Sequence, residues 1–154
     1  MRISLWVPGR FSLTNKMLSN LRAAGRYSGK QRPVGWRDLF AEETAAIQLA
    51  VVAAAKRVTP AVQMALDSAA DKLWNVHVGV FGHHKHDPDS WLLLGKAAVD
   101  GLVAARVFSS DRFNLWELSG RTYRSREEER LAMLTVNASA RSMGALLTLT
   151  DVTP

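Results

Sequence analysis

The sequence predicts a single α+β domain in which a small mixed β-sheet packs against helices. Strand-like and helix-like segments follow one another along the 154 residues, and no internal repeat or long Gly/Ser/Pro linker divides them. With 47% hydrophobic residues, the chain can bury roughly two-thirds of the surface that its unfolded form exposes. It contains no cysteine, which excludes disulfide scaffolds, Cys-ligated metal sites and thiolate catalysis.

The first half of the chain is predicted to hold one strand and two helices. Arg2–Val7 is rich in β-forming residues and ends at a Pro-Gly turn. Trp36–Arg57 has apolar residues at helical spacing, acidic residues in its opening turns and a basic pair at its end, which suits the helix dipole. Thr59-Pro60 is typical of an N-cap followed by proline at the first helical position, so Ala61 to about Lys72 is predicted as a second helix.

The second half begins with a strand and a helix. Trp74–Phe81 alternates apolar and polar residues, which predicts a half-buried strand, and a loop follows at 82–88. Ser90 to about Ala105 is predicted as a helix capped by Asp89 or Ser90, and Phe113–Leu118 as a further strand.

The C-terminal third has two interpretations. Ser125–Glu128 has the capping-box pattern that begins a helix, whereas Leu131–Val136 and Leu146–Val152 are rich in strand-forming residues. We favour strands late in the chain.

Positive charge is concentrated near the N-terminus. The net charge is +6, yet residues 1–37 hold eight basic residues and no acidic one, while the remainder holds twelve basic and fourteen acidic residues. Such a segment repels itself, and phosphates would relieve the repulsion by displacing counterions, so nucleic acid is the expected partner. The alternative is a solvated, partly disordered stretch whose charge only aids solubility.

The longest apolar run in the middle of the chain, Leu49–Ala55, is far short of the ~18 residues that a membrane span needs. Ile3–Val7 is also shorter than the apolar region of about 7 to 15 residues in a signal peptide. We therefore expect a cytoplasmic protein without a membrane span.

Carboxylates gather around the predicted strand–loop–helix unit. Asp87 and Asp89 are two residues apart, so in extended backbone they project to one side and can bind a divalent cation such as Mg²⁺. Asp111 can join them only if the chain turns back over 106–110. The alternatives are an Asp/Pro turn with a helix cap, and for Lys96 and Asp100 a surface ion pair at i,i+4.

Two further features have alternative interpretations. His83, His84 and His86 lie beside the aspartates and could instead form a transition-metal site, although adjacent histidines cannot easily all face one ion. Stacking platforms for unpaired bases could come from Trp6, Trp36, Trp74, Trp91 and Trp116, but tryptophans in strands and helices more often belong to the core. Trp91, next to the acidic pair, is the one that we consider as a platform.

The order and spacing of these residues resemble the signature of the RusA-like Holliday-junction resolvase family. The residues that carry the resemblance are Asp87-Pro88-Asp89-Ser90-Trp91, Lys96, Asp100-Gly101-Leu102-Val103, Val107 and Asp111. The N-terminal Leu5–Arg10 followed by Asn15-Lys16 is similar to the family's opening strand, Pro-Gly turn and basic loop. The resemblance therefore covers roughly residues 1–118. The step from Asp89 to Lys96 is similar to a longer-spaced variant associated with phage and actinobacterial members. Ser90 stands where the family usually has Asn, and Ser110 where it usually has the first Asp of an acidic pair.

The resemblance implies a RusA-like fold over residues 1–154 and a homodimeric, Mg²⁺- or Mn²⁺-dependent endodeoxyribonuclease that resolves four-way DNA junctions by paired nicks. Asp87, Asp89 and Asp111 would hold the metal, and Lys96 would supply a fixed positive charge to the phosphate.

The remaining residues would have auxiliary roles. Ser90 and Asp100 would support the site, and a basic segment at about 8–37 would contact backbone phosphates through Lys16, Arg22, Arg26, Lys30 and Arg32. The alternative is a non-catalytic or weakly catalytic protein on the same fold that binds nucleic acid by its structure, cleavage having been lost through Ser90 and Ser110.

Overall fold

The computed structural model describes residues 1–11, 36–81, 87–134 and 143–154, without the side chains of 36–40, 88 and 89. Four strands form one mixed sheet in the order β1-β4-β2-β3. Their bounds are Arg2–Pro8 for β1, Trp74–Val80 for β2, Leu115–Thr122 for β3 and Gly144–Asp151 for β4. Strand β4 is antiparallel to both β1 and β2, whereas β2 and β3 are parallel. The predicted α+β class and mixed sheet are confirmed.

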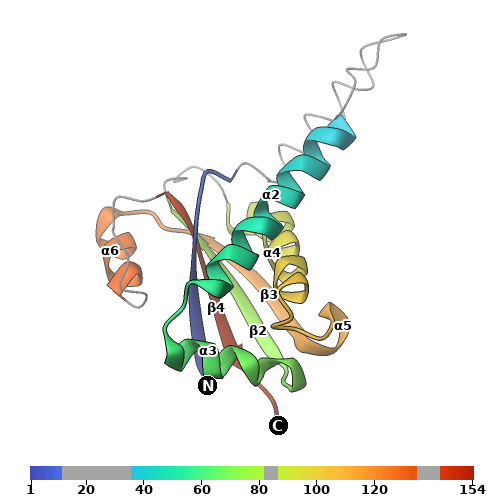
Figure 1. Ribbon diagram of the computed structural model, residues 1–154. Helices are drawn as coiled ribbons and strands as arrows, with labels where there is room; N and C mark the ends of the chain where they lie inside the picture. The colour runs from blue at the N-terminus through green and yellow to red at the C-terminus, as the bar shows by residue number, and fades with distance from the viewer. Residues whose placement is uncertain (12–35, 82–86, 135–142) are drawn as a thin grey trace.

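Helices α2 (Trp36–Lys56) and α4 (Leu92–Ala104) cover one face of this sheet and enclose the main core (Figure 1). The two helices approach closely at Gly101, where a Cβ atom would lie 2.8 Å from the Val51 Cβ and 3.2 Å from the Gln48 Cα. Only glycine has room there, so this position sets the distance between α4 and α2. The largest apolar side chains buried in this core include Leu5, Ile47, Trp74, Trp91, Leu94, Leu102, Phe108, Leu147 and Leu149.

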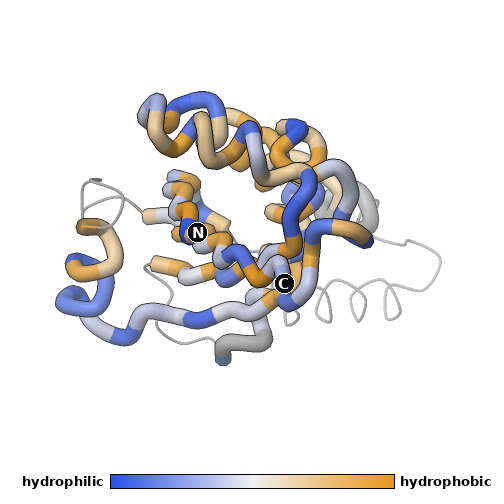
Figure 2. Tube along the Cα trace, turned by 90° about the horizontal axis from the view of Figure 1, so that it is seen from below, coloured by the Kyte–Doolittle hydropathy of each residue, from blue (hydrophilic) through white to orange (hydrophobic). Residues whose placement is uncertain are grey.

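The opposite face of the sheet is covered only at one end, by helix α6 (Arg126–Leu134), as far as the described residues show (Figure 2). Met133 of α6 packs there with Phe81, Tyr123 and Leu146 in a second, smaller core. Further along this face the strands carry polar side chains, and the imidazole Nδ1 of His77 shares a 2.8 Å hydrogen bond with the Ser119 hydroxyl.

The helix predicted after Thr59-Pro60 begins as expected but ends earlier. Helix α3 spans Pro60–Asp67, and the Thr59 hydroxyl accepts a hydrogen bond from the backbone N–H of Val62 at 3.4 Å. The predicted extension to Lys72 is wrong, because the chain continues as a 3₁₀ turn, η1 (Ala69–Asp71). Trp74 explains this turn: its indole N–H donates to the Ala69 carbonyl at 2.9 Å, which draws the turn onto the start of β2.

Three predictions in the second half of the chain are corrected. The helix predicted from Ser90 begins as a 3₁₀ turn, η2 (Pro88–Trp91), and the N-cap of α4 is Trp91 without a side-chain cap, not Asp89 or Ser90. Phe113 belongs to a one-turn helix, α5 (Asp111–Asn114), so the predicted strand starts later, at Leu115, and runs on to Thr122.

The third correction concerns the segment predicted as a strand at Leu131–Val136. Residues 126–134 form α6, because the Ser125 hydroxyl caps the backbone N–H of Glu128 and the Glu128 carboxylate accepts the backbone N–H of Arg124. Residues 135 and 136 lie outside the described ranges. The last predicted strand is confirmed as β4.

No single helix among those described is long and apolar enough to cross a membrane, and only the α2 segment 41–56 taken together with 60–71, bent by 117°, passes by length and composition.

Candidate functional site

The chain turns back after α4, as the sequence predicted for residues 106–110. Arg106 adopts a left-handed conformation with φ 61°, a backbone region that ordinarily favours glycine at a helix end. The N–H groups of Val107 and Phe108 then bond to the Leu102 carbonyl at 2.9 and 3.2 Å, and both side chains are buried. The helix therefore ends sharply, and burial of Val107 and Phe108 holds the reversed chain against the core.

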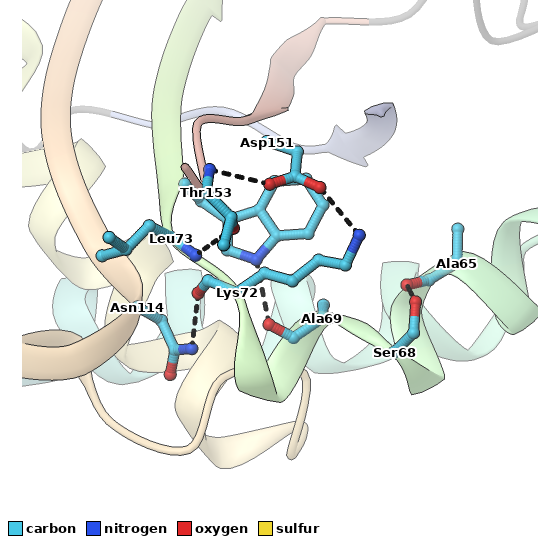
Figure 3. Close-up of polar contacts among 9 residues, drawn as sticks. Ala65, Ser68, Ala69, Lys72, Leu73, Asn114, Asp151 and Thr153 are labelled. Carbon is cyan, nitrogen blue, oxygen red and sulfur yellow. Dashed lines mark hydrogen bonds and ion pairs between the residues drawn. The ribbon is translucent and has the colours of Figure 1, made fainter.

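Asn114 fixes the returning segment to η1 and to the residues that lead into β2. Its side chain is 1% exposed, and its Oδ1 accepts hydrogen bonds from the Ser109 N–H, the Ser109 hydroxyl and the Ser110 N–H at 2.8, 2.9 and 3.1 Å. Its Nδ2 donates to the carbonyls of Ala70 and Lys72 at 2.7 and 2.9 Å, the second of which Figure 3 shows. The sequence did not indicate this residue, since an isolated Asn carries no local pattern that marks a buried hydrogen-bond network.

The returning segment brings Asp111 to Lys96. The Lys96 Nζ donates to Asp111 Oδ2 at 2.5 Å and to Asp100 Oδ1 at 3.0 Å. Ser110 supports this placement as the N-cap of α5, where its hydroxyl accepts the N–H of Phe113 at 3.2 Å. We refer to Lys96, Asp100 and Asp111 as the Lys96 cluster.

Hydrogen bonds set the charge states within the Lys96 cluster. The hydrogen bond to Asp111 and then that to Asp100 raise the pKa of Lys96, and the hydrogen bond from Lys96 lowers the pKa of Asp111. All three side chains are partly open to solvent. The cluster is therefore an accessible group of one cation and two carboxylates on the outer side of α4.

The Asp87–Asp89 segment lies at the far end of β3. Trp91, which closes η2, is 1% exposed and donates its indole N–H to the Thr122 hydroxyl at 2.8 Å. This contact holds η2 against the last residue of β3. The Ser90 N–H donates a hydrogen bond to the Asp87 carbonyl at 3.0 Å and so forms the turn. The prediction that Trp91 is a stacking platform is wrong, because its ring belongs to the core.

The structure brings the predicted residues together only in part. Asp111, Lys96 and Asp100 are in contact, and Asp87 is exposed beside Ser90. The Asp89 carboxylate is outside the described part, and among the side chains that are described no three His, Asp or Glu residues gather closely enough to hold a metal ion.

The remaining candidates lie outside the described ranges: Lys16, Arg22, Arg26, Lys30 and Arg32 of the basic segment, and His83, His84 and His86. No protein-family model, curated protein or solved structure matches the chain significantly. A functional assignment therefore depends on the chemistry of the residues and on the sequence resemblance.

Proposed function

We propose that this protein is a Mg²⁺- or Mn²⁺-dependent endonuclease, resembling the RusA-like resolvases, that binds four-way DNA junctions as a homodimer and cuts them by paired nicks. The observation that carries the proposal is the contact of the Lys96 Nζ with both Asp100 and Asp111. Residues 15 positions apart meet there because the chain reverses after α4. The resemblance requires these residues at one site, and their contact supports it.

The available donors suit a hard divalent cation. Asp87 and Asp111 present carboxylates to solvent, and oxygen ligands are those that Mg²⁺ and Mn²⁺ prefer. By the resemblance, Asp87, Asp89 and Asp111 would hold the ion, and because Asp87 precedes η2 at the far end of β3 from Asp111, these carboxylates would have to draw together to do so. When bound, the ion would orient a water molecule and stabilise the charge that builds on the scissile phosphate. Lys96 lowers the pKa of Asp111 further and so favours the ionised form that a ligand requires.

Lys96 and Asp100 have separate tasks in this proposal. The Lys96 ammonium supplies a positive charge beside the phosphate, where a preorganised cation lowers the energy of the transition state. Asp100 lies one helical turn away and positions Lys96, so the ammonium keeps one partner when Asp111 binds a cation. Lys96 is therefore proposed as a catalytic residue and Asp100 as a positioning residue.

The N-terminal charge supports DNA as the substrate. Residues 1–37 contain eight basic and no acidic residues, and such a segment binds phosphates by releasing counterions. Phosphate contacts give affinity for the shape of a branched DNA with little reading of base sequence. Binding should consequently weaken steeply with salt.

The test is cleavage of a labelled synthetic four-way junction in Mg²⁺ or Mn²⁺, beside a linear duplex of the same sequence. Symmetric, metal-dependent nicking of the junction, lost in Asp89→Asn and retained in Glu127→Gln, would support the proposal. Glu127 is the control because it is an exposed carboxylate on α6, which covers the opposite face of the sheet from α4 (Figure 2). Tight junction binding without cleavage would instead favour the non-catalytic binding protein. Equal affinity for junction and duplex, without cleavage, would contradict both.

A further inference from the structure

Two large aromatic side chains are exposed close in sequence to Asp111 of the Lys96 cluster. Phe113 is 77% and Trp116 70% exposed, whereas Trp74 and Trp91 are buried. Phe113 lies on α5, the four-residue helix that begins with Asp111, and Trp116 follows at the start of β3 (Figure 1). Exposure of such rings forfeits the stabilisation that burial would supply, so two of them within four positions indicate a contact surface.

A β-bulge sets Trp116 apart from the sheet. Trp74 of β2 is opposite Leu115 of β3, but the next residue, Asn75, is opposite Glu117. Trp116 is thus an extra residue without a partner in the ladder, on the outer strand of the order β1-β4-β2-β3. Bulges bend a strand and redirect a side chain, and they are common beside functional sites.

We propose that Trp116 and Phe113 form a stacking surface for a nucleobase that is unpaired or splayed at the branch of a DNA junction held at the Lys96 cluster. This inference rests on the proposed function. Aromatic rings stack on any base through its flat face, and exposed Arg112, next to Phe113 in sequence, offers a cation to the adjoining phosphate.

The area of this surface favours a base over a second copy of the chain. Two aromatic side chains bury about 150–250 Å² each. A stable protein–protein interface needs about 800 Å² from each partner. The pair is therefore too small to build a dimer by itself, whereas a single nucleobase is comparable in size to one aromatic ring.

The test uses Trp116→Ala, Trp116→Phe and the control Met64→Ala, whose side chain on α3 is 74% exposed and lies away from α5. Each full-length protein binds a four-way junction with 2-aminopurine at the branch point, and affinity, 2-aminopurine fluorescence and nicking are measured. Trp116→Ala should weaken binding by about 5- to 100-fold and abolish the fluorescence change. Trp116→Phe should retain most of both, and Met64→Ala should match the wild type.

The outcomes separate this inference from the proposed function. If the wild type acts on junctions but Trp116→Ala keeps its affinity and fluorescence change, stacking is refuted while the endonuclease proposal stands. If sedimentation shows that Trp116→Ala loses a dimer that Met64→Ala retains, the surface contacts a second copy and base stacking is refuted. If the wild type does not bind junctions, the proposed function fails and this inference fails with it.

Discussion

Replacement of Asn114 by Asp tests whether this amide holds the returning segment in place. The substitution keeps the size of the side chain and its acceptor oxygen, but it removes both N–H donors. The carbonyls of Ala70 and Lys72, which accept those donors at 2.7 and 2.9 Å, would then face an oxygen. The change therefore removes two of the five hydrogen bonds of the Asn114 side chain and leaves the three to its acceptor oxygen.

The expected cost follows from these two bonds. A buried acceptor that loses its partner costs about 1–3 kcal/mol. The Ala70 carbonyl keeps the Ser109 hydroxyl as a donor at 3.2 Å, so the main loss is at the Lys72 carbonyl, and Asn114→Asp should lower the free energy of unfolding by about 1–3 kcal/mol near neutral pH. Ser109→Ala is the matched control, since the Ser109 hydroxyl donates to Asn114 Oδ1 at 2.9 Å from an exposed position. It should cost only about 0.5–1.5 kcal/mol.

Urea unfolding followed by circular dichroism would measure both variants, with an unchanged slope as the sign of an intact two-state transition. NMR titration of Asp111 adds a local readout. If the returning segment loosens in Asn114→Asp, Lys96 no longer holds Asp111, and the pKa of Asp111 should rise toward its ordinary value. A loss of stability below about 1 kcal/mol, with the Asp111 titration unchanged, would refute the role given to Asn114.

Three further predictions concern other parts of the molecule. Lys96→Ala should bind a four-way junction nearly as well as the wild type, measured by gel shift, but nick it at least about 100-fold more slowly in single-turnover cleavage. An equal loss of binding and of nicking would contradict a catalytic role for Lys96. Lys72 donates to Asp151 at 2.7 Å and holds the pKa of that carboxyl well below its usual range, so this stabilisation is present above about pH 4 and lost as pH falls further. The Tm difference between the wild type and Asp151→Asn should therefore shrink from pH 7 to pH 2, and a constant difference would refute the assignment. Gly79→Ala would place a Cβ 2.5 Å from the Tyr123 ring. The variant should lower the free energy of unfolding by about 1–3 kcal/mol, measured by chemical denaturation. Unchanged stability would show that the Tyr123 ring can move away without cost.

Local patterns predicted most of the regular elements. The alternation at Trp74–Phe81, the Thr59-Pro60 start of α3 and the apolar spacing of α2 depend on neighbours within a few residues, and all three elements are present. The capping box at Ser125 also indicated a helix correctly. The strand preferred at Leu131–Val136 was wrong because the cap and the burial of Met133 outweigh the strand propensity of a short apolar run.

The candidate site, too, could be predicted only in part from the sequence. Sequence spacing identified Lys96, Asp100 and Asp111 as a possible group and located the reversal that would bring them together. It did not identify Asn114 or the left-handed Arg106, which make that reversal, because their partners lie on η1, just before β2 and at the end of α4. Trp91 was misjudged for a related reason: only the packed structure places its indole N–H against Thr122 on β3.

The sequence by itself determined the α+β class, the main helices and strands and the N-terminal concentration of positive charge, and the family resemblance placed Lys96, Asp100 and Asp111 at one site. Periodicity, caps and charge counts are local properties, so one sequence suffices to read them. Tertiary structure alone decided the strand order β1-β4-β2-β3, the burial of Trp91, the exposure of Trp116 by a bulge and the anchoring of the returning segment by Asn114. These features depend on contacts between residues tens of positions apart, whose energies arise only when the sheet and helices pack.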